Sequence, residues 1–331
     1  MVPPMTEPSA TRDAQPTVAV VIPCYREKDR VLDVIAGIGD EVSHIFVIDD
    51  ACPDGTGAFV RDRCRDPRVS VLTHGRNRGV GGATMTGYEL AWKAGCDIIV
   101  KVDGDGQMDP ARIPGLIAPI VVGEADYAKG NRFHDLSGLS DMPAVRVGGN
   151  LFLSFASKLS SGYWDIFDPT NGFTAIDAGV AKALPFAKLS PGYFFESDLL
   201  FRLNLLRAVV ADVPMEARYG DERSSLKIRN VVIEFLFKHA RNTAKRFCYG
   251  YFLRDFNIAS IELALGSLLL GFGAVFGAFK WAESSATGIP TTAGTAMVAA
   301  LPIIIGTQML IAFLDFDTRN QPTTPLHPRL S

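Results

Sequence analysis

Several features that define common protein classes are missing from this chain of 331 residues. Its five cysteines are scattered and form no CxxC pair, which argues against a disulfide framework or a zinc site and for a reducing compartment. The net charge is only −3 and there is no arginine-rich aromatic patch, so nucleic acid is not an expected partner. The first sixteen residues lack the apolar core of a secretory signal, and we expect a disordered lead.

Long apolar runs are abundant instead. Hydrophobic residues make up 47% of the chain, with a mean hydropathy of +0.15, and the excess lies near the C-terminus. Residues 258–279 carry one charge, Glu262, and residues 293–314 carry none. A bilayer core takes about 20 helical residues, so both segments are long enough to cross it. They predict a transmembrane hairpin joined by a loop at 280–292; a buried hairpin of a soluble domain is the alternative.

The segment before the first span is basic. Between residues 218 and 254 there are nine Lys or Arg against three Asp or Glu. Residues 231–254 predict an amphipathic helix at the membrane interface, with an ordinary core-packed helix as the alternative. By the positive-inside rule, the N-terminal domain and the tail from Asn320 are expected on the cytoplasmic side. The apolar stripe of this helix consists of Ile233, Leu236, Phe237, Ala240, Ala244 and Phe247.

The N-terminal part of the chain alternates short apolar runs with helical patterns. This alternation predicts an α/β fold, a Rossmann-like and mostly parallel sheet with helices on both faces. Ligands of such sheets bind outside the carboxyl ends of the strands. We expect strands at 17–23, 44–48, 69–72, 98–102 and 209–215, helices at 30–38, 56–65 and 85–94, and a glycine-rich turn at 77–82.

The acidic motif after the fourth of these strands is the most informative one. Asp103 and Asp105 are separated by Gly104, and Gln107 follows. Two carboxylates and an amide oxygen at a strand end can converge on Mg²⁺ or Mn²⁺, which favour oxygen ligands and keep positions open for substrate phosphates. A surface turn is the alternative, because Asp and Gly also form turns.

Three other motifs fall on the same predicted rim, at residues 22–27, 49–56 and 77–83. Their order and spacing, with the acidic motif, resemble the family-2 inverting glycosyltransferases, whose nucleotide-sugar-binding domain is called GT-A. The membrane-attached branch of dolichol-phosphate mannose synthases and polyprenyl-phosphate glucosyltransferases is similar over about residues 17–230. The resemblance implies a GT-A domain at 17–230, an interfacial helix at 231–256, a membrane hairpin at 257–317 and a cytoplasmic tail at 318–331.

The resemblance also implies roles for individual residues on the donor side. Asp103 and Asp105 would hold a divalent cation that bridges the donor diphosphate, with Gln107 assisting. Asp50 would contact the base or ribose, and Arg78 would lie near the phosphates. The nucleotide-sugar-binding residues would be Pro23, Tyr25, Glu27, Asp50, Asn77, Arg78, Gly82, Asp103 and Gly104.

On the acceptor side, residues 168–173 are similar to the family's Asp-x-x-x-Gly-Phe segment, although Thr174 stands where the family usually has Arg. One residue is also inserted between Ser225 and Lys227 relative to the family pattern. Structural ion pairs are the alternative interpretation for Arg132, Glu196 and Asp198. The catalytic residues implied by the resemblance are Asp105, Arg132, Asp168, Glu196, Asp198, Arg218 and Lys227.

These implications lead to one hypothesis: metal-dependent, inverting transfer of a hexose from a UDP- or GDP-sugar to a polyprenyl phosphate. The enzyme would work at the cytoplasmic face of the inner membrane, or at the endoplasmic reticulum membrane of a eukaryote. A lipid phosphate needs no strong general base because it is already largely anionic at pH 7. Two alternatives stay open: a saccharide hydroxyl acceptor, with Asp168 or Asp198 as base, and an inactive membrane scaffold. The glycines of the first span would permit, without requiring, a homo-oligomer.

Overall fold

A computed structural model of the chain describes residues 15–132, 144–169, 171–215 and 228–330. The chain divides into two compact units. The first unit contains Met1–Asn242 together with Pro322–Ser331, and the second contains Thr243–Gln321.

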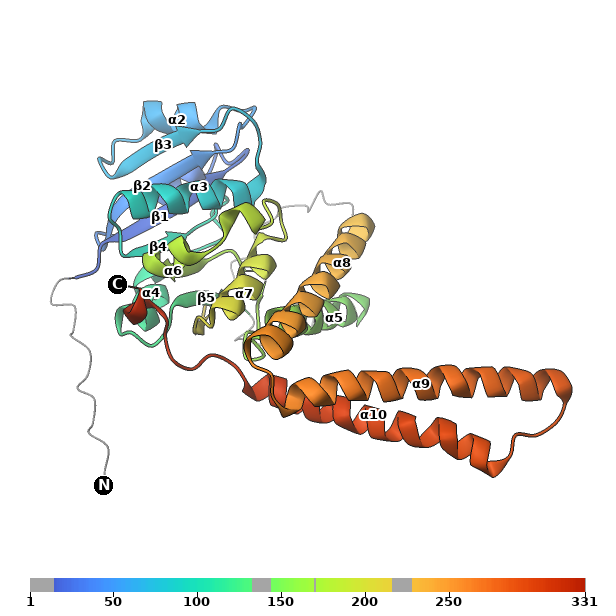
Figure 1. Ribbon diagram of the computed structural model, residues 1–331. Helices are drawn as coiled ribbons and strands as arrows, with labels where there is room; N and C mark the ends of the chain where they lie inside the picture. The colour runs from blue at the N-terminus through green and yellow to red at the C-terminus, as the bar shows by residue number, and fades with distance from the viewer. Residues whose placement is uncertain (1–14, 133–143, 170, 216–227, 331) are drawn as a thin grey trace, which may run out of the picture. The chain divides into compact units, whose positions relative to one another are not determined.

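Seven strands of the first unit form one sheet in the order β3-β2-β1-β4-β6-β5-β7 (Figure 1). Neighbouring strands are parallel except at β6, which runs antiparallel to both β4 and β5. The mostly parallel α/β sheet expected from the sequence is therefore confirmed. The strands are β1 (Val18–Cys24), β2 (Val42–Asp49), β3 (Val69–Thr73), β4 (Ile98–Lys101), β5 (Tyr127–Asn131), β6 (Thr174–Asp177) and β7 (Val210–Pro214).

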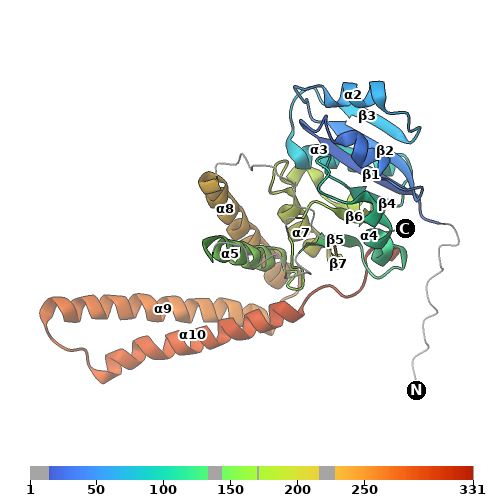
Figure 2. The same ribbon diagram turned by 180° about the vertical axis from the view of Figure 1, so that it is seen from behind.

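Helices cover both faces of the sheet, as expected (Figures 1 and 2). Alternate residues of each central strand point to opposite faces, so that Val20 and Val21 of β1 belong to two different hydrophobic cores. One core packs against α1 (Val31–Ala36), α2 (Thr56–Arg63) and α4 (Ile113–Val121), which follows the short η1 (Pro110–Arg112). The other packs against α3 (Gly79–Lys93), α6 (Ala178–Ala183), η3 (Phe186–Lys188) and α7 (Phe195–Leu206).

The glycine-rich segment at 77–82 is not the turn that the sequence predicted. Helix α3 begins at Gly79, so most of these glycines form its first turn. The helix start is stabilised by a distant carboxylate. Asp50, the residue directly after β2, accepts hydrogen bonds from the backbone N–H groups of Arg78 and Gly79. Gly79 has φ +80°, and a Cβ on Gly81 would lie 2.7 Å from Phe195, so glycine is needed for both conformation and close packing.

Two helices and the C-terminal tail complete the first unit. The helices are α5 (Ala144–Ser161) and α8 (Ile228–Phe247), of which the part up to Asn242 belongs to this unit. The tail contains η5 (His327–Arg329), and the backbone N–H groups of Leu326 and His327 donate to the buried carboxylate of Asp126 at 2.8 Å. The residues that follow the second apolar segment therefore bind the same unit as the sheet.

The second unit is a helical hairpin. Helix α8 ends in a π-helical turn, η4 (Cys248–Arg254), and is followed by α9 (Ile258–Thr287) and α10 (Ala293–Arg319). The loop predicted at 280–292 is wrong in extent, because α9 continues to Thr287 and ends at Gly288 with φ +69°. Close helix contacts are made by Gly266 and Gly273: a Cβ on either would lie within 3.0 Å of α10 atoms.

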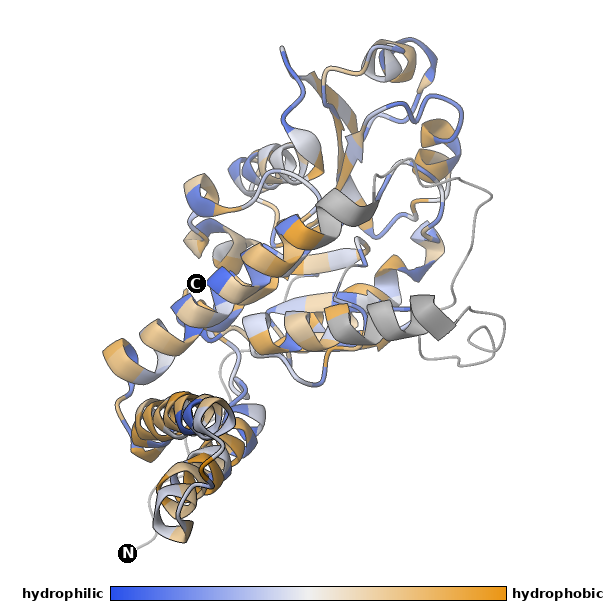
Figure 3. Cartoon of the chain, turned by 90° about the vertical axis from the view of Figure 1, so that its right-hand side faces the viewer, coloured by the Kyte–Doolittle hydropathy of each residue, from blue (hydrophilic) through white to orange (hydrophobic). Residues whose placement is uncertain are grey.

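Helices α9 and α10 are long and apolar enough to cross a membrane, judged by length and composition (Figure 3). In their most apolar windows only 22% and 11% of the residues are buried, whereas a core helix of a soluble protein is mostly buried. At the α10 end, the buried Asp317 forms an ion pair with Arg246 at 2.7 Å and accepts a hydrogen bond from Tyr251 at 2.5 Å. These polar groups join the end of α10 to the end of α8 and to η4.

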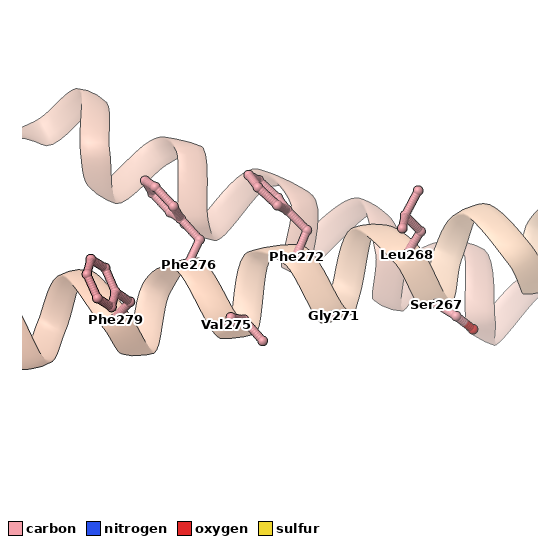
Figure 4. Close-up of a pocket in the computed structure, with 7 residues that line it drawn as sticks. All are labelled: Ser267, Leu268, Gly271, Phe272, Val275, Phe276 and Phe279. Atoms are coloured by element: carbon pink, nitrogen blue, oxygen red, sulfur yellow. The ribbon is translucent and has the colours of Figure 1, made fainter.

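The outer face of α9 carries a shallow apolar groove (Figure 4). Gly271 lies at its centre and has no neighbouring atom within 4 Å of an added Cβ. The expectation that the glycines allow close helix contact is met within the hairpin for Gly266, Gly273 and Gly277, whereas Gly271 faces outward. The groove is lined by Ser267, Leu268, Gly271, Phe272, Val275, Phe276 and Phe279.

Candidate active site

The acidic motif stands at the carboxyl end of β4, where a buried lysine pairs with it. Lys101 is the last residue of the strand and is 1% exposed. Its Nζ lies 2.7 Å from Asp103 Oδ1 and 3.1 Å from Glu196 Oε1, and donates to the carbonyl of Gly172 at 3.4 Å. Burial lowers the pKa of Lys101, but the two carboxylates outweigh it, so the pKa stands above its usual value. A charged lysine thus joins α7 to the motif.

The remainder of the motif forms a tight turn. Asp105 Oδ1 accepts the backbone N–H of Gln107 at 2.9 Å, and Arg30 donates to the carbonyl of Asp105 at 3.1 Å. Gly106 has φ +74°, which favours glycine. A Cβ on Gly104 would lie 3.1 Å from Cys24 Sγ and 3.2 Å from Glu27 Cβ, so the loop after β1 packs directly on the motif.

The oxygen atoms of this motif fit a divalent cation of the Mg²⁺ or Mn²⁺ type. Asp103, Asp105 and Gln107 offer hard oxygen ligands, and Asp103 is partly exposed, with 29% of its side chain accessible. Gly172 packs against Asp103, since an added Cβ there would lie 2.5 Å from Asp103 Oδ2. Across the described residues, no three His, Cys, Asp or Glu side chains gather into a metal cage. The set suits an ion whose other ligands come from the phosphates of a substrate.

The carboxylates after β2 have different partners. Asp50 is buried; its Oδ1 accepts from Arg78 N at 2.8 Å and its Oδ2 from Gly79 N at 2.7 Å. His74 Nδ1 lies 2.6 Å from Asp50 Oδ1. Asp49 accepts from the backbone of Cys52 and Gly57 at 2.7 and 2.8 Å. Both carboxylates therefore hold the starts of helices and loops around the rim.

The other residues expected at the nucleotide surround this rim. Pro23 lies within β1, paired with Ile48 of β2. Tyr25 is 42% exposed, with the guanidinium of Arg26 5.5 Å from its ring centroid. Asn77 Oδ1 accepts from Gly79 N at 3.0 Å, and Gly82 N donates to the carbonyl of Pro191 at 3.0 Å.

A second buried lysine supports the segment before β6. Lys129 of β5 and Lys101 of β4 are both in register with Thr174, one on each side of β6. Lys129 Nζ donates to the carbonyl of Asn171. Burial lowers the pKa of Lys129 to about 8, although Glu196 and Asp168 act in the opposite direction. The carbonyls of residues 171 and 172 are thus each held by a lysine.

Arg132 and Asp168 form a two-pronged ion pair beside these lysines. Arg132 Nε donates to Asp168 Oδ2 at 2.7 Å and Nη2 to Oδ1 at 3.2 Å. The Asp168 side chain is fully buried, whereas 36% of the Arg132 side chain is exposed. The geometry presents one face of a fixed guanidinium at the surface.

Asp198 is turned away from the other acidic side chains. Its Oδ1 accepts from Asn242 of α8 at 3.0 Å, and its Oδ2 accepts from Ser190 N at 2.9 Å and faces Arg202 at 3.4 Å. His239 of α8 lies 2.7 Å from Ser160 Oγ, and burial lowers its pKa to about 4. These polar contacts fix α8 to α5 and α7.

Residues 19–184 match the family described as "Glycosyl transferase family 2", which is half of the chain. The chain belongs to glycosyltransferase family 2.

Relatives extend this finding along the catalytic unit. The glycosyltransferase is 28% identical over 236 residues to the UDP-N-acetylglucosamine–dolichyl-phosphate N-acetylglucosaminyltransferase of Methanococcus voltae, covering 67% of this chain and 93% of the relative. It is 30% identical over 215 residues to the undecaprenyl-phosphate mannosyltransferase of Micrococcus luteus, covering 63% of this chain and 87% of the relative.

A solved structure confirms the GT-A-like fold. Glucosyl-3-phosphoglycerate synthase from Mycobacterium tuberculosis, crystallised with Mn²⁺ and uridine-diphosphate-glucose, superposes with a TM-score of 0.53 at 21% identity. The match covers 69% of this chain and 79% of that structure. At this identity the likeness concerns the fold alone.

The structure of this glycosyltransferase therefore brings most of the expected residues to one edge of the sheet. Arg218 and Lys227 lie outside the described residues. The roles of the individual residues stay predictions. Sequence reasoning missed Lys101, Lys129, His74 and Asn171; for the lysines a signal existed, because a charge inside an apolar strand requires a buried partner.

Proposed function

We propose that this glycosyltransferase moves a hexose from a nucleoside-diphosphate sugar to a polyprenyl phosphate, with Mg²⁺ or Mn²⁺ and with inversion at the sugar. The observation that carries the proposal is the similarity over 93% and 87% of two relatives whose names give dolichyl and undecaprenyl phosphates as substrates. The apolar helices α9 and α10 support it, because a lipid acceptor is found in a membrane.

The donor would lie at the carboxyl ends of β1, β2 and β4. Asp103 and Asp105, with Gln107, would hold the cation, which when bound neutralises charge on the departing diphosphate. Asp50 acts in this proposal by accepting the backbone N–H groups of Arg78 and Gly79 and so holding the start of α3, which would keep Arg78 near the donor phosphates. Tyr25 is exposed enough to stack on a nucleoside base.

The acceptor chemistry needs positioning more than proton transfer. The second pKa of a phosphomonoester is about 6, so the attacking oxygen is already anionic at neutral pH. The part-exposed guanidinium of Arg132, oriented by Asp168, is a suitable contact for such a phosphate. Arg218 and Lys227 remain proposed as further phosphate contacts. Stabilisation of the sugar cation falls to Glu196 among the acidic side chains near the motif.

The contacts of the other two carboxylates weaken the saccharide-acceptor alternative. That reaction needs a general base, for which Asp168 and Asp198 were the candidates. Asp168 is fully buried and held by two nitrogens of Arg132, Nε and Nη2. Asp198 is bound by Asn242, Ser190 N and Arg202. Neither carboxylate is presented to a substrate hydroxyl.

The membrane attachment follows from α8, the hairpin and the tail. Helix α8 leaves Ile233 and Phe237 63% and 70% exposed, and Arg241 and Lys245 are also exposed. This basic, apolar surface suits the interface of an anionic membrane. In this proposal the chain crosses the membrane twice, through α9 and α10, because the tail binds Asp126 of the catalytic unit and the two would lie on one side. We propose that both face the cytoplasm, in accord with the basic residues before α9.

The test is a transfer assay with the full chain in lipid nanodiscs. It supplies UDP- and GDP-sugars, Mn²⁺ or Mg²⁺, and either undecaprenyl phosphate or a free saccharide. We expect labelled sugar on the lipid phosphate, in a product that is labile to mild acid. Transfer to the saccharide but not to the lipid phosphate would refute the proposed acceptor. Absence of transfer to either, with every donor, would favour the inactive scaffold.

A further inference from the structure

The ammonium of Lys101 occupies one of the carboxylates that are proposed to bind the cation. Its Nζ lies 2.7 Å from Asp103 Oδ1, which is the distance of a direct ion pair. The other carboxylate of the motif belongs to Asp105, two residues further along, and its Oδ1 accepts a hydrogen bond from the backbone N–H of Gln107. The protein therefore offers two carboxylates to a cation and neutralises one of them itself.

Lys101 is held in this position from several sides. Its side chain is 1% exposed, Glu196 Oε1 lies 3.1 Å from Nζ, and the Gly172 carbonyl accepts from Nζ at 3.4 Å. A Cβ on Gly172 would lie 2.5 Å from both Lys101 Nζ and Asp103 Oδ2, so these groups fill the space closely. Moving the ammonium away would leave Glu196 buried without its cation, which is costly.

We propose that Lys101 is a positioning residue that lowers the affinity of Asp103 and Asp105 for a divalent ion, so that the ion binds together with a nucleoside diphosphate. This inference rests on the proposed function and deepens it. The ammonium repels an incoming divalent ion and competes with it for Asp103. A diphosphate supplies the missing negative charge and oxygen ligands. Lys101 at the same time holds Asp103 in one orientation, which gives the ion–nucleotide complex a fixed ligand.

The test is Mn²⁺ binding to the full chain in detergent, followed by the electron paramagnetic resonance signal of free Mn²⁺. The key comparison is made without nucleotide, between wild type and Lys101→Met. We expect the variant to bind Mn²⁺ at least about tenfold more tightly, because a buried positive charge next to the seat has been removed. Unchanged or weaker binding by a folded Lys101→Met would overturn the proposal.

Two further variants keep the test decisive. Lys101→Met combined with Glu196→Gln removes a cation and an anion together, so it should fold even if the single variant does not. Because loss of the Glu196 charge lowers the attraction for Mn²⁺, we expect a smaller tightening in the same direction; unchanged or weaker binding by the folded double variant would overturn the proposal. Adding Asp105→Asn to Lys101→Met should abolish the gain; if the gain persists, Mn²⁺ binds elsewhere and the proposal fails.

Lys129→Met is the matched control. It also removes a buried lysine beside the segment at 171–172, but Lys129 binds the Asn171 carbonyl, whereas Asp103 pairs with Lys101. We expect a smaller tightening. An equal effect of both substitutions would refute a specific role for Lys101.

With UDP or GDP present, the apparent affinity of the wild-type protein for Mn²⁺ should be at least about tenfold higher than expected if protein and nucleotide bound Mn²⁺ independently. Lys101→Met should gain less from the nucleotide; an equal gain would contradict the proposal. Because these measurements use neither sugar nor lipid, they can succeed even if the proposed acceptor is wrong.

Discussion

The two halves of the catalytic sheet use the carboxylates at their strand ends in different ways. After β2, Asp49 and Asp50 accept hydrogen bonds mainly from backbone N–H groups. Across β4, β6 and β5, the carboxylates of Asp103, Glu196 and Asp168 pair with Lys101 or Arg132. The first arrangement fixes the backbone after β2 and at the start of α3. The second places the carboxylates of the proposed cation and phosphate sites next to side-chain cations.

The difference shows why acidic residues at strand ends are not equivalent. A carboxylate whose oxygens accept hydrogen bonds from backbone amides stabilises the fold and has few acceptor positions left for a ligand. A carboxylate paired with a side-chain cation can exchange that partner for another cation. On this basis only the second half is expected to respond directly to divalent ions, and the following predictions test that division.

The largest effect is expected from crowding the cation-paired half. Gly172→Ala would place a Cβ 2.5 Å from both Asp103 Oδ2 and Lys101 Nζ and displace them. We expect sugar transfer to fall at least about a hundredfold. The matched control is Gly192→Ala, where an added Cβ meets nothing within 4 Å and which has no positive φ. Equal activity of the two variants, measured as initial rates, would contradict the close packing at Asp103.

The amide-saturated half should respond through stability. Asp50→Asn removes the charge that two backbone N–H groups and His74 share, and we expect the free energy of unfolding to fall by about 2 kcal/mol. Asp62→Asn, at an exposed position of α2, serves as the control and should leave stability unchanged. Denaturant unfolding of the solubilised chain measures both. If Asp50→Asn loses donor binding at unchanged stability, Asp50 is a nucleotide ligand rather than an anchor.

The docking of α8 should make stability depend on pH. His239 is kept neutral in the folded state, with a pKa of about 4, whereas an unfolded histidine takes up a proton near 6.5. The unfolded state then binds more protons between these values, so stability falls as the pH drops from 6.5 towards 4. The contribution is at most about 1.4 kcal/mol per pH unit. Melting curves of His239→Gln should show a shallower pH dependence; an identical slope would refute the assignment.

The smallest effect is expected at the tail. His327 Nδ1 lies 2.8 Å from Asp126 Oδ1, and the contact supplements the backbone bonds to the same carboxylate. His327→Ala should lower the free energy of unfolding by about 1 kcal/mol and speed protease cleavage of the tail. Arg329→Ala, which is exposed, is the control. Faster cleavage in the control alone would contradict docking through His327.

Much of the fold could be predicted from the sequence because its signals are local. Apolar runs such as 18–22 and 98–100 specify buried strands, and Asp103-Gly104-Asp105 marks the end of one. The start of α3 could not be predicted locally, since the carboxylate that stabilises it comes from Asp50, 28 residues earlier for Arg78. The local sequence at 77–82 predicts a turn because it is rich in glycine. The hydrogen bonds to Asp50 stabilise a helix there instead.

The acidic residues of the candidate site could be predicted from the sequence, whereas the pairing of a lysine with two of them could not. Motif order pointed to Asp103, Asp168 and Glu196, but no sequence spacing reveals that Lys101 reaches Glu196, 95 residues away. The antiparallel insertion of β6 between β4 and β5 brings these residues together. Asp198 shows the same limit in reverse: it lies only two residues from Glu196, but about half a helical turn separates their side chains, and the Asp198 carboxylate binds Asn242 of α8.

The central claim is that Asp103 and Asp105 form the cation seat of a sugar transferase acting on a polyprenyl phosphate. The most direct measurement is transfer of labelled sugar to undecaprenyl phosphate by metal-stripped wild type and Asp105→Asn, each titrated with Mn²⁺. We expect wild type to regain transfer as Mn²⁺ is added, whereas Asp105→Asn, folded to the same melting temperature, stays inactive at every concentration. Full transfer without a divalent ion, or by Asp105→Asn, would contradict it.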